Sequence, residues 1–323
     1  MIDGNYIYKV CIRCMTFNHS AFITDALNGF SMQETDFPYI SVIIDDASTD
    51  GNQRVILDYV QKYFNTEEEG VSWTKEDGYA CYYFARHKDN LNCYFAVLLL
   101  KNNQFGKPSK AEHIKEWEKD AQYVAICEGD DYWIDKSKLF RQVRLMDEHP
   151  EYSMCTENGY WLDVRDNEMS PFSSNPEKDI DFEELLVRRQ FPTASVIYRN
   201  CFSSDILRLH EPVLDTSVWA CLSKLGIIHY QPIISSVYRR GFGITEKDKI
   251  KWAYTVRRFN KSLYQDFVIP DGIKALRDKD VAQNLKKGLK DAEQRRRYSD
   301  MFRLGIYYII TKAKNLIRHF SIH

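Results

Sequence analysis

The chain has 323 residues, of which 44% are hydrophobic and 28% charged, and its formal net charge at pH 7 is −2. This length allows a sizeable core, and the balanced charge provides no basic field that would hold a nucleic acid. No run approaches the roughly 20 apolar residues of a membrane-spanning helix. The N-terminus shows no basic segment followed by an apolar one, so we expect neither a spanning helix nor a signal peptide.

Eight cysteines are scattered through mostly apolar stretches, and a chain of this size needs no disulfide framework. A reducing cytosol is therefore the expected compartment. Cys11 and Cys14 form a CxxC motif, but no second pair accompanies them, and both lie in a strand-like run. This context favours two strand cysteines over a zinc or redox site.

The first half of the chain alternates between strand-like and helix-like segments. Helical spacing of apolar residues begins at Phe22, with Asn18 or Ser20 as candidate N-caps. The alternation predicts a mostly parallel, doubly wound α/β sheet flanked by helices, which is a Rossmann-like architecture. The expected strands are 8–15, 39–44, 81–85, 94–100 and 123–127, and the expected helices are 22–30, 55–64, 112–121 and 138–148.

The second half is mixed and then helical. We expect a catalytic domain over 1–245, with a nucleotide-binding half (about 1–135) and an acceptor half (about 136–245), followed by a helical extension over 246–323. In the acceptor half the expected strands are 160–164, 195–198, 227–230 and 233–238, and the expected helices are 182–188 and 217–225.

Polar side chains follow three of the expected strands at the point where each strand ends. They are Thr16 to His19, the pair Asp45 and Asp46, and the run Glu128–Asp131. In an open parallel sheet, ligands bind beyond the carboxyl ends of the strands, so these residues are candidates for a binding site. The aspartate pair taken alone is more typical of a turn that caps the following helix.

The acidic run at 128–131 is the strongest chemical signal. Its three carboxylates repel one another unless a cation, a cationic side chain or water screens them. Gly129 lets the backbone bend, so that the flanking acids can converge on one ion. Carboxylates without nearby histidines favour Mg²⁺ or Mn²⁺, which often bind substrate phosphates as well. We therefore expect a reaction whose leaving group is a phosphate ester or a nucleoside diphosphate.

Other phosphate-binding and hydrolytic motifs are absent from the sequence. No GxGxxG follows the first strand, and no GxxxxGK[ST] occurs anywhere, which argues against a dinucleotide-binding domain and a P-loop enzyme. A GxSxG nucleophile elbow is also missing.

Three segments together resemble the family 2 glycosyltransferases of GT-A fold, of the bacterial polysaccharide type. They are 10–18, the stretch IDDASTDG at 44–51, and the stretch EGDDYW at 128–133. The resemblance covers about residues 7–240. It implies an inverting, metal-assisted transferase that uses a nucleotide-sugar donor, usually a UDP-sugar, and adds a hexosyl or N-acetylhexosaminyl group to a glycan or lipid-linked acceptor.

The resemblance also implies roles for individual residues. Thr16 and Asn18 would contact the nucleotide, although Met15 stands where the family has proline. Asp45 and Asp46 match the paired acids, one of which recognises the base or ribose. Glu128 to Asp130 occupies the family's DXD position, with Glu replacing the first Asp. Asp130 would be the principal ligand of Mn²⁺ or Mg²⁺, and Glu128 would act through the ribose or a metal-bound water.

The general base implied by the family is an acid at the start of a helix in the second half. Asp215 has that place, but Thr216 follows it where the family has an aromatic residue. Local sequence fits a helix cap equally well. Tyr238 and Arg239 match the family's Tyr-Arg element and are candidates to close over the diphosphate.

Asp131 and Trp133 are candidates to face the acceptor, and orienting the loop is the alternative role for Asp131. For Trp133, the alternative to stacking on a sugar is packing beneath the acidic run at 128–131, which is called the acidic bend below.

The basic and apolar tail from Arg295 to Arg318 predicts either an interfacial membrane helix, at the inner face of the plasma membrane, or a docking helix. Two rival functions remain open. One is an inactive sugar-nucleotide or glycan-binding module on the same fold, and the other is a nucleotidyltransferase. The nucleotidyltransferase usually has a glycine-rich loop after its first strand, and this chain has none.

Overall fold

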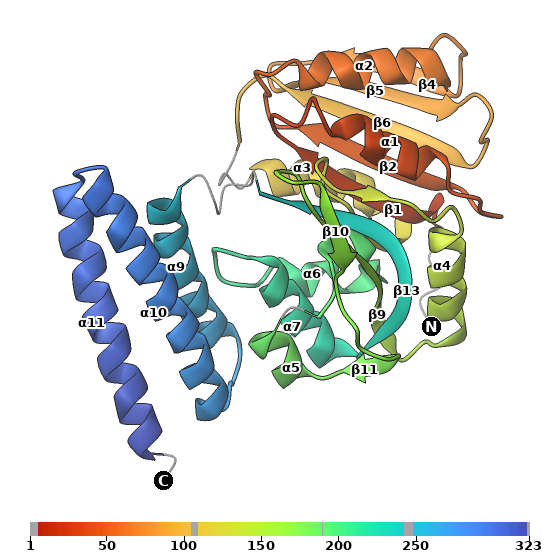
Figure 1. Cartoon of the computed structure of the whole chain (residues 1–323). Helices are drawn as coiled ribbons and strands as arrows, with labels where there is room; N and C mark the ends of the chain where they lie inside the picture. Colours follow the sequence, from red (N-terminus) through yellow and green to blue (C-terminus); the bar gives the residue numbers. More distant parts are fainter. Residues whose placement is uncertain (1–5, 105–108, 189, 242–247, 322–323) are drawn as a thin grey trace. The chain divides into compact units, whose positions relative to one another are not determined.

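The computed structural model describes residues 6–104, 109–188, 190–241 and 248–321 (Figure 1). The chain forms two compact units. The first contains 1–179, 191–203 and 226–239, and the second contains 180–190, 204–225 and 240–323. The predicted domain boundary at residue 245 lies outside the described residues, so that division stays a prediction.

Four parallel strands form the centre of the first unit, in the order β7, β1, β2, β6. Their sequences are nearly continuous apolar runs, as expected for strands that are covered on both faces. The predicted parallel α/β sheet is therefore confirmed. The strands are β1 (Tyr8–Thr16), β2 (Tyr39–Asp45), β6 (Cys93–Leu100) and β7 (Ala121–Ile126).

An antiparallel edge extends the sheet beyond β6. β5 (Ala80–His87) pairs antiparallel with β6, and β3 (Phe64–Asn65) and β4 (Ser72–Glu76) pair with β5. The polar stretch at 65–80 thus contributes a strand of a hairpin.

Helices cover the central strands. Ile23, Leu27 and Phe30 of α1 are fully buried and belong to the same core cluster as side chains of α2 and α4. On the other sheet face, Trp117 of α3 packs against a second cluster that includes Ile40 and Leu98. The helices are α1 (Ile23–Ser31), α2 (Asn52–Tyr63), α3 (Ser109–Glu118) and α4 (Lys138–Glu148).

The predicted N-cap of α1 is wrong. Phe22 occupies the N-cap position, and no side chain caps the helix there. Asn18 and Ser20 instead bond to the turn after β2: Asn18 Oδ1 accepts from the Thr49 amide (2.8 Å), and the Ser20 amide donates to Asp50 (2.9 Å).

The rest of the sheet is antiparallel. β12 (Ile197–Arg199) lies between β7 and β9 (Tyr152–Asp163), and β10 (Glu168–Pro171) pairs with β9. β13 (Ile227–Arg240) pairs with β8 (Tyr132–Trp133) directly after the acidic bend. The two strands predicted at 227–230 and 233–238 are one continuous strand. Short elements complete this region: β11 (Lys178–Ile180), η1 (Thr193–Ser195) and η2 (Asn200–Phe202).

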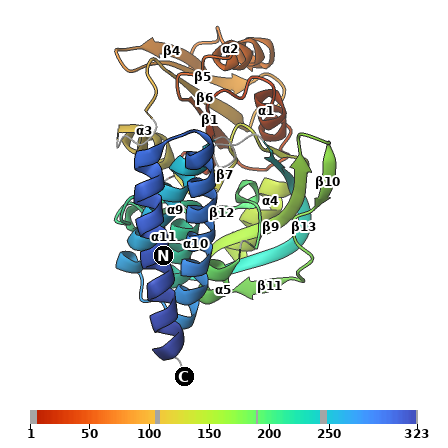
Figure 2. The same cartoon turned by 60° about the vertical axis from the view of Figure 1, so that its left-hand side comes forward.

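The second unit is helical among its described residues, as Figure 2 shows for its three long helices. Two buried clusters hold it together, one around Leu263 and Phe259 and one around Leu285 and Leu304. Within the described chain, no helix combines the length and apolar character needed to cross a bilayer. The helices are α5 (Phe182–Val187), α6 (Ser203–Ile206), α7 (Asp215–Leu225), α9 (Lys249–Asp266), α10 (Asp271–Gln294) and α11 (Tyr298–Ser321).

Candidate functional site

The structure brings the polar ends of β7, β1 and β2 to one edge of the sheet. Thr16 is in register with Asp45. The Asp46 amide donates to the Thr16 carbonyl at 3.0 Å, and the Gly129 amide donates to the Met15 carbonyl at 2.9 Å. The three segments singled out in the sequence therefore meet around the end of β1.

Asp45 holds the backbone turn together. It is fully buried, and Oδ1 accepts from the Ser48 amide (2.9 Å) and Gln53 Nε2 (2.8 Å), while Oδ2 accepts from Asn52 Nδ2 (2.7 Å). Asn52 Nδ2 also donates to Thr16 Oγ1 at 2.9 Å. Buried carboxylates with this many donors stabilise the surrounding loop, so Asp45 acts here as a structural acid.

Asp46 connects the end of β2 to the segment after β6. Its side chain is buried and accepts from the Gln104 amide at 2.6 Å, and its carbonyl accepts from Asn103 Nδ2 at 3.0 Å. Asn18, by contrast, is exposed and has a positive φ of 57°, which asparagine tolerates better than most residues. Asn18 and the turn at 48–50 form an exposed polar rim beside Thr16.

The acidic bend rests on Thr16. Gly129 is buried, and Glu128 and Asp130 on either side of it are half-buried. The Asp130 carboxylate is 25% exposed, and its single ion-pair contact among the described residues is with His19 Nε2 at 3.8 Å, beyond hydrogen-bond distance. His19 Nδ1 in turn lies 3.3 Å from Thr16 Oγ1. Of the acids at this edge, Asp130 presents a carboxylate that no donor of the described residues holds at hydrogen-bond distance.

Asp131 and Arg239 lock the other side of the bend. Asp131 is buried, and its Oδ1 accepts from the Arg239 amide at 2.9 Å. Arg239 Nη1 donates to the Asp130 carbonyl at 2.8 Å, and Nη2 pairs with Asp25 on α1. The guanidinium also lies 4.4 Å from the ring centroid of Tyr132. In this structure Arg239 therefore positions the bend.

Trp133 and Tyr238 are packing residues in this structure. Trp133 is 2% exposed, its indole N–H donates to the Ala194 carbonyl at 2.6 Å, and Lys138 Nζ lies 4.4 Å from its ring centroid. Tyr238 packs edge-on against Trp161, with ring centroids 5.0 Å apart. The structure thus supports packing beneath the bend for Trp133, not stacking on a sugar.

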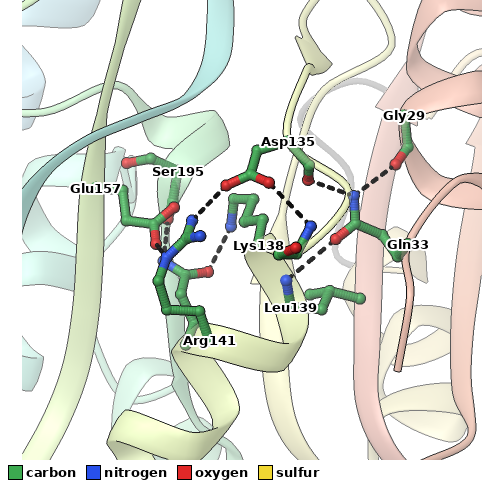
Figure 3. A network of polar contacts seen from close by, with 10 residues as sticks. Gly29, Gln33, Asp135, Lys138, Leu139, Arg141, Glu157 and Ser195 are labelled. Atoms are coloured by element: carbon green, nitrogen blue, oxygen red, sulfur yellow. Dashed lines mark hydrogen bonds and ion pairs between the residues drawn. The ribbon is translucent and has the colours of Figure 1, made fainter. Parts of the chain in front are cut away.

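A polar network anchors the segment that follows the bend (Figure 3). Arg141 on α4 joins Asp135 and Glu157, with a nitrogen-to-oxygen distance of 2.7 Å to each. The Gln33 amide donates to the carbonyls of Asp135 (2.9 Å) and Gly29 (3.0 Å). These contacts tie the bend to α1, α4 and β9, so its backbone is fixed from several directions.

Two cysteines beside the bend remain neutral thiols. Burial raises the pKa of Cys14 well above its usual value, and the negative charges of Glu128 and Asp130 raise it further. Burial and the nearby Asp131 likewise raise the pKa of Cys127. Thiolates, which favour softer metals, are therefore disfavoured here, and the donor set at this edge is oxygen-rich.

The residues of the bend fit a hard cation that is shared with a substrate. Among the described residues, no three or more His, Cys, Asp and Glu side chains are arranged to hold a metal by themselves. Mg²⁺ sites often use only one or two carboxylates together with substrate phosphates and water. The partly exposed Asp130, with half-buried Glu128 beside it, matches that pattern.

Asp215 belongs to the second unit, whereas the residues described above belong to the first. It is an exposed residue in the first turn of α7. An acid there stabilises the helix dipole whether or not it has another role.

Two participants, Asn52 and Asp25, escaped the sequence-based prediction, and for His19 the contact with Asp130 was not foreseen. His19 approaches Asp130, Asn52 joins Thr16 to Asp45, and Asp25 pairs with Arg239. His19 belongs to a polar strand end that the sequence had marked. No local pattern marks Asp25, which lies 214 positions from Arg239.

We compared the chain with known protein families, sequences and structures. No family model matches the chain. It is 30% identical over 248 residues to uncharacterized proteins of Mycobacterium tuberculosis and Mycobacterium bovis. The aligned stretch covers 76% of this chain but only 61% of the length of those relatives.

Among solved structures, S. aureus TarS 1–349 superposes with a TM-score of 0.57 at 14% identity, covering 96% of this chain and 88% of that one. The same fragment in complex with UDP gives 0.56. A mannosyltransferase from Pyrobaculum calidifontis, in complex with GDP-Man and Mn²⁺, gives 0.54 at 11% identity and covers 98% of this chain and 87% of that one. The chain thus has a fold found in glycosyltransferase structures, as the sequence predicted.

Proposed function

We propose that this chain is an inverting, metal-assisted glycosyltransferase of the family 2 type. Its donor would be a nucleoside-diphosphate sugar, with UDP-sugars as the first candidates. The group transferred would be a hexosyl or N-acetylhexosaminyl residue. The acceptor would be a glycan or a lipid-linked glycan, as in polysaccharide assembly.

One observation carries the proposal: Thr16, the turn after Asp46 and the partly exposed Asp130 lie together at the carboxyl edge of three adjacent parallel strands. That edge is where ligands bind in open α/β sheets. Similarity of fold to proteins solved with UDP and with GDP-Man and Mn²⁺ supports the same reading.

The donor's nucleotide would lie along the rim formed by Thr16, Asn18 and the turn that Asp45 holds. Asp46 would contribute to recognition of the base or ribose. Glu128 and Asp130 would hold Mg²⁺ or Mn²⁺, which when bound neutralises negative charge on the leaving diphosphate. Arg239 would keep the bend in place through the Asp130 carbonyl.

Asp215 is the proposed general base. Its carboxylate would accept the proton of an acceptor hydroxyl while that oxygen forms a bond to the anomeric carbon. The bond from that carbon to the diphosphate oxygen breaks at the same time, and the nucleoside diphosphate leaves with the bonding pair. Attack opposite the leaving group inverts the configuration.

A thermal-shift panel tests the proposal. UDP-, GDP- and dTDP-sugars are added with and without Mn²⁺ to the wild type, to Asp130→Asn and to Asp58→Asn, an exposed acid of α2 used as a control. A ligand at 100 times its Kd stabilises the folded state by about 2.7 kcal/mol. We expect one nucleotide class to stabilise the wild type and the control in the presence of metal, but not Asp130→Asn. The proposal would be rejected if the sugar nucleotide stabilised the wild type and Asp130→Asn equally, with and without Mn²⁺.

A further inference from the structure

The outer face of α11 carries a row of exposed apolar side chains. Phe302 and Ile309 are 71% and 68% exposed, and Ile306 and Leu316 continue the row, so that its members are spaced by four, three and seven residues. We call this surface the apolar strip; its members are Tyr298, Phe302, Ile306, Ile309, Ile310, Leu316 and Ile317. Within the described part of this unit, the strip has no covering element.

Basic side chains flank the apolar strip. By helical geometry, Lys312 lies along one margin and Arg303 and Lys314 along the other, and all three are exposed. The single acid in the first turn of α11, Asp300, is paired with Arg297. An apolar face between basic margins is the pattern of a helix that lies in the interface of an anionic membrane.

A cavity of about 390 Å³ lies among α9, α10 and α11, beside the strip. Its lining includes four cations, Arg257, Lys261, Lys314 and Arg318, and one acid, Asp278. Ile310 belongs to both the lining and the apolar strip, so the two features are neighbours. We call the space among these three helices the cationic cavity.

The positive charge of the cationic cavity is only partly compensated. Asp278 pairs with Arg318 and accepts from Tyr264 Oη at 3.1 Å. Among the residues that the structure describes, the side chains of Lys261 and Lys314 form neither a hydrogen bond nor an ion pair. Two lysine ammonium groups at an open cavity offer a site for the phosphate of an anionic ligand.

We propose that the helical unit binds the surface of a membrane that contains anionic phospholipids. The apolar strip lies among the acyl chains, and the cationic cavity holds a lipid phosphate through Lys261 and Lys314. Charge decides between this partner and a second copy of the chain. Two strips facing each other would bring their lysine and arginine margins together, whereas an anionic lipid surface complements them.

Co-sedimentation of the full chain with vesicles tests the proposal without nucleotide or sugar, so its outcome is independent of the proposed transfer reaction. Vesicles of phosphatidylcholine alone are compared with vesicles that also contain phosphatidylglycerol. We expect strong binding to the mixed vesicles only. The Lys261→Ala/Lys314→Ala variant should lose about 30-fold in affinity for them, as expected for two cationic side chains near an anionic surface.

The apolar strip is tested by Phe302→Ser/Ile309→Ser, which replaces two exposed side chains and should leave the fold intact. We expect a loss of about 10-fold or more in vesicle binding, in line with the burial of two large apolar groups. Leu276→Ser and Lys287→Ala, at exposed positions on α10, are the matched controls and should bind as the wild type does.

Three results would overturn the proposal. One is equal binding to neutral and mixed vesicles. Another is a wild-type dimer that the strip variant converts to monomer, with vesicle binding unchanged. The third is stabilisation by inorganic phosphate, lost in the lysine variant, in a protein that does not sediment with either vesicle.

Discussion

Gly129 lies so close to Thr16 that a β-carbon added at residue 129 would stand 2.6 Å from both Cβ and Oγ1 of Thr16. It would also lie 2.9 Å from Cδ1 of Ile23. The backbone of Gly129 therefore packs directly against the side chain of Thr16. Glycine is required here because of this close approach and not because of its backbone conformation. Gly129 is not among the residues with positive φ.

Replacing this glycine should disturb the bend and the fold together. In Gly129→Ala the new methyl group must displace the end of β1, and overpacking of this kind costs about 1–3 kcal/mol. Chemical denaturation measures the loss. Gly78→Ala is the matched control, because an added β-carbon there meets nothing within 4 Å. Equal stability of the two variants would show that the contact with Thr16 is not as tight as described.

Asp45 and Asp130 should respond differently to the same chemical change. In Asp45→Asn an amide N–H₂ replaces an acceptor that faces donors, so we expect a loss of about 1–3 kcal/mol in the free energy of unfolding. Asp130→Asn removes a partly exposed carboxylate that has no close donor in the described part of the chain, and should leave stability nearly unchanged. A large destabilisation in Asp130→Asn, or none in Asp45→Asn, would contradict this separation of structural and binding acids.

Arg239 should affect donor binding through the backbone of the bend. Arg239→Lys cannot hold the Asp130 carbonyl and the Asp25 carboxylate in one planar fork. We expect about a 10-fold weaker Kd for the nucleotide by calorimetry, ~1.4 kcal/mol. Arg54→Lys, whose ion pair with Asp58 is on the surface, should bind as the wild type does. An unchanged Kd in Arg239→Lys would show that Arg239 does not contribute to donor binding.

Asp215→Asn separates catalysis from binding. As a first-turn acid of α7 it adds about 0.3–1 kcal/mol through the helix dipole, so stability should fall little. Loss of a general base lowers the rate about 100- to 10,000-fold. Hydrolysis of the stabilising donor, with water as acceptor, provides the measurement, and Asp205→Asn in the same unit is the control. Near-normal turnover with normal donor binding would reject Asp215 as the base.

Periodicity and strand ends predicted much of the first unit. The bounds of α4 agree with the predicted 138–148, and the apolar runs of β1 and β2 marked covered parallel strands. The strands converge because parallel neighbours end at one edge, which follows from the order of elements. Convergence of Thr16, Asp46 and Asp130 was therefore predictable from the sequence.

Long-range contacts were not predictable. Asn18 and Ser20 have the side chains of helix caps, yet they bond to the turn at 48–50, which local propensity cannot anticipate. β13 continues through Pro232 because that residue is exposed, and proline is tolerated where no ladder bond is needed. Burial of Trp133 likewise depends on Ala194, which lies 61 positions away.

We propose that the bend at 128–130 holds a divalent ion that binds the donor's diphosphate. Calorimetric titration of the stabilising nucleotide, with Mn²⁺ and with EDTA, tests it in the wild type, Asp130→Asn and Asp58→Asn. We predict that EDTA weakens wild-type and Asp58→Asn binding by about 10-fold or more, ~1.4 kcal/mol. Asp130→Asn should bind weakly under both conditions. Equal wild-type affinity with Mn²⁺ and with EDTA, or a full metal effect in Asp130→Asn, would contradict the claim.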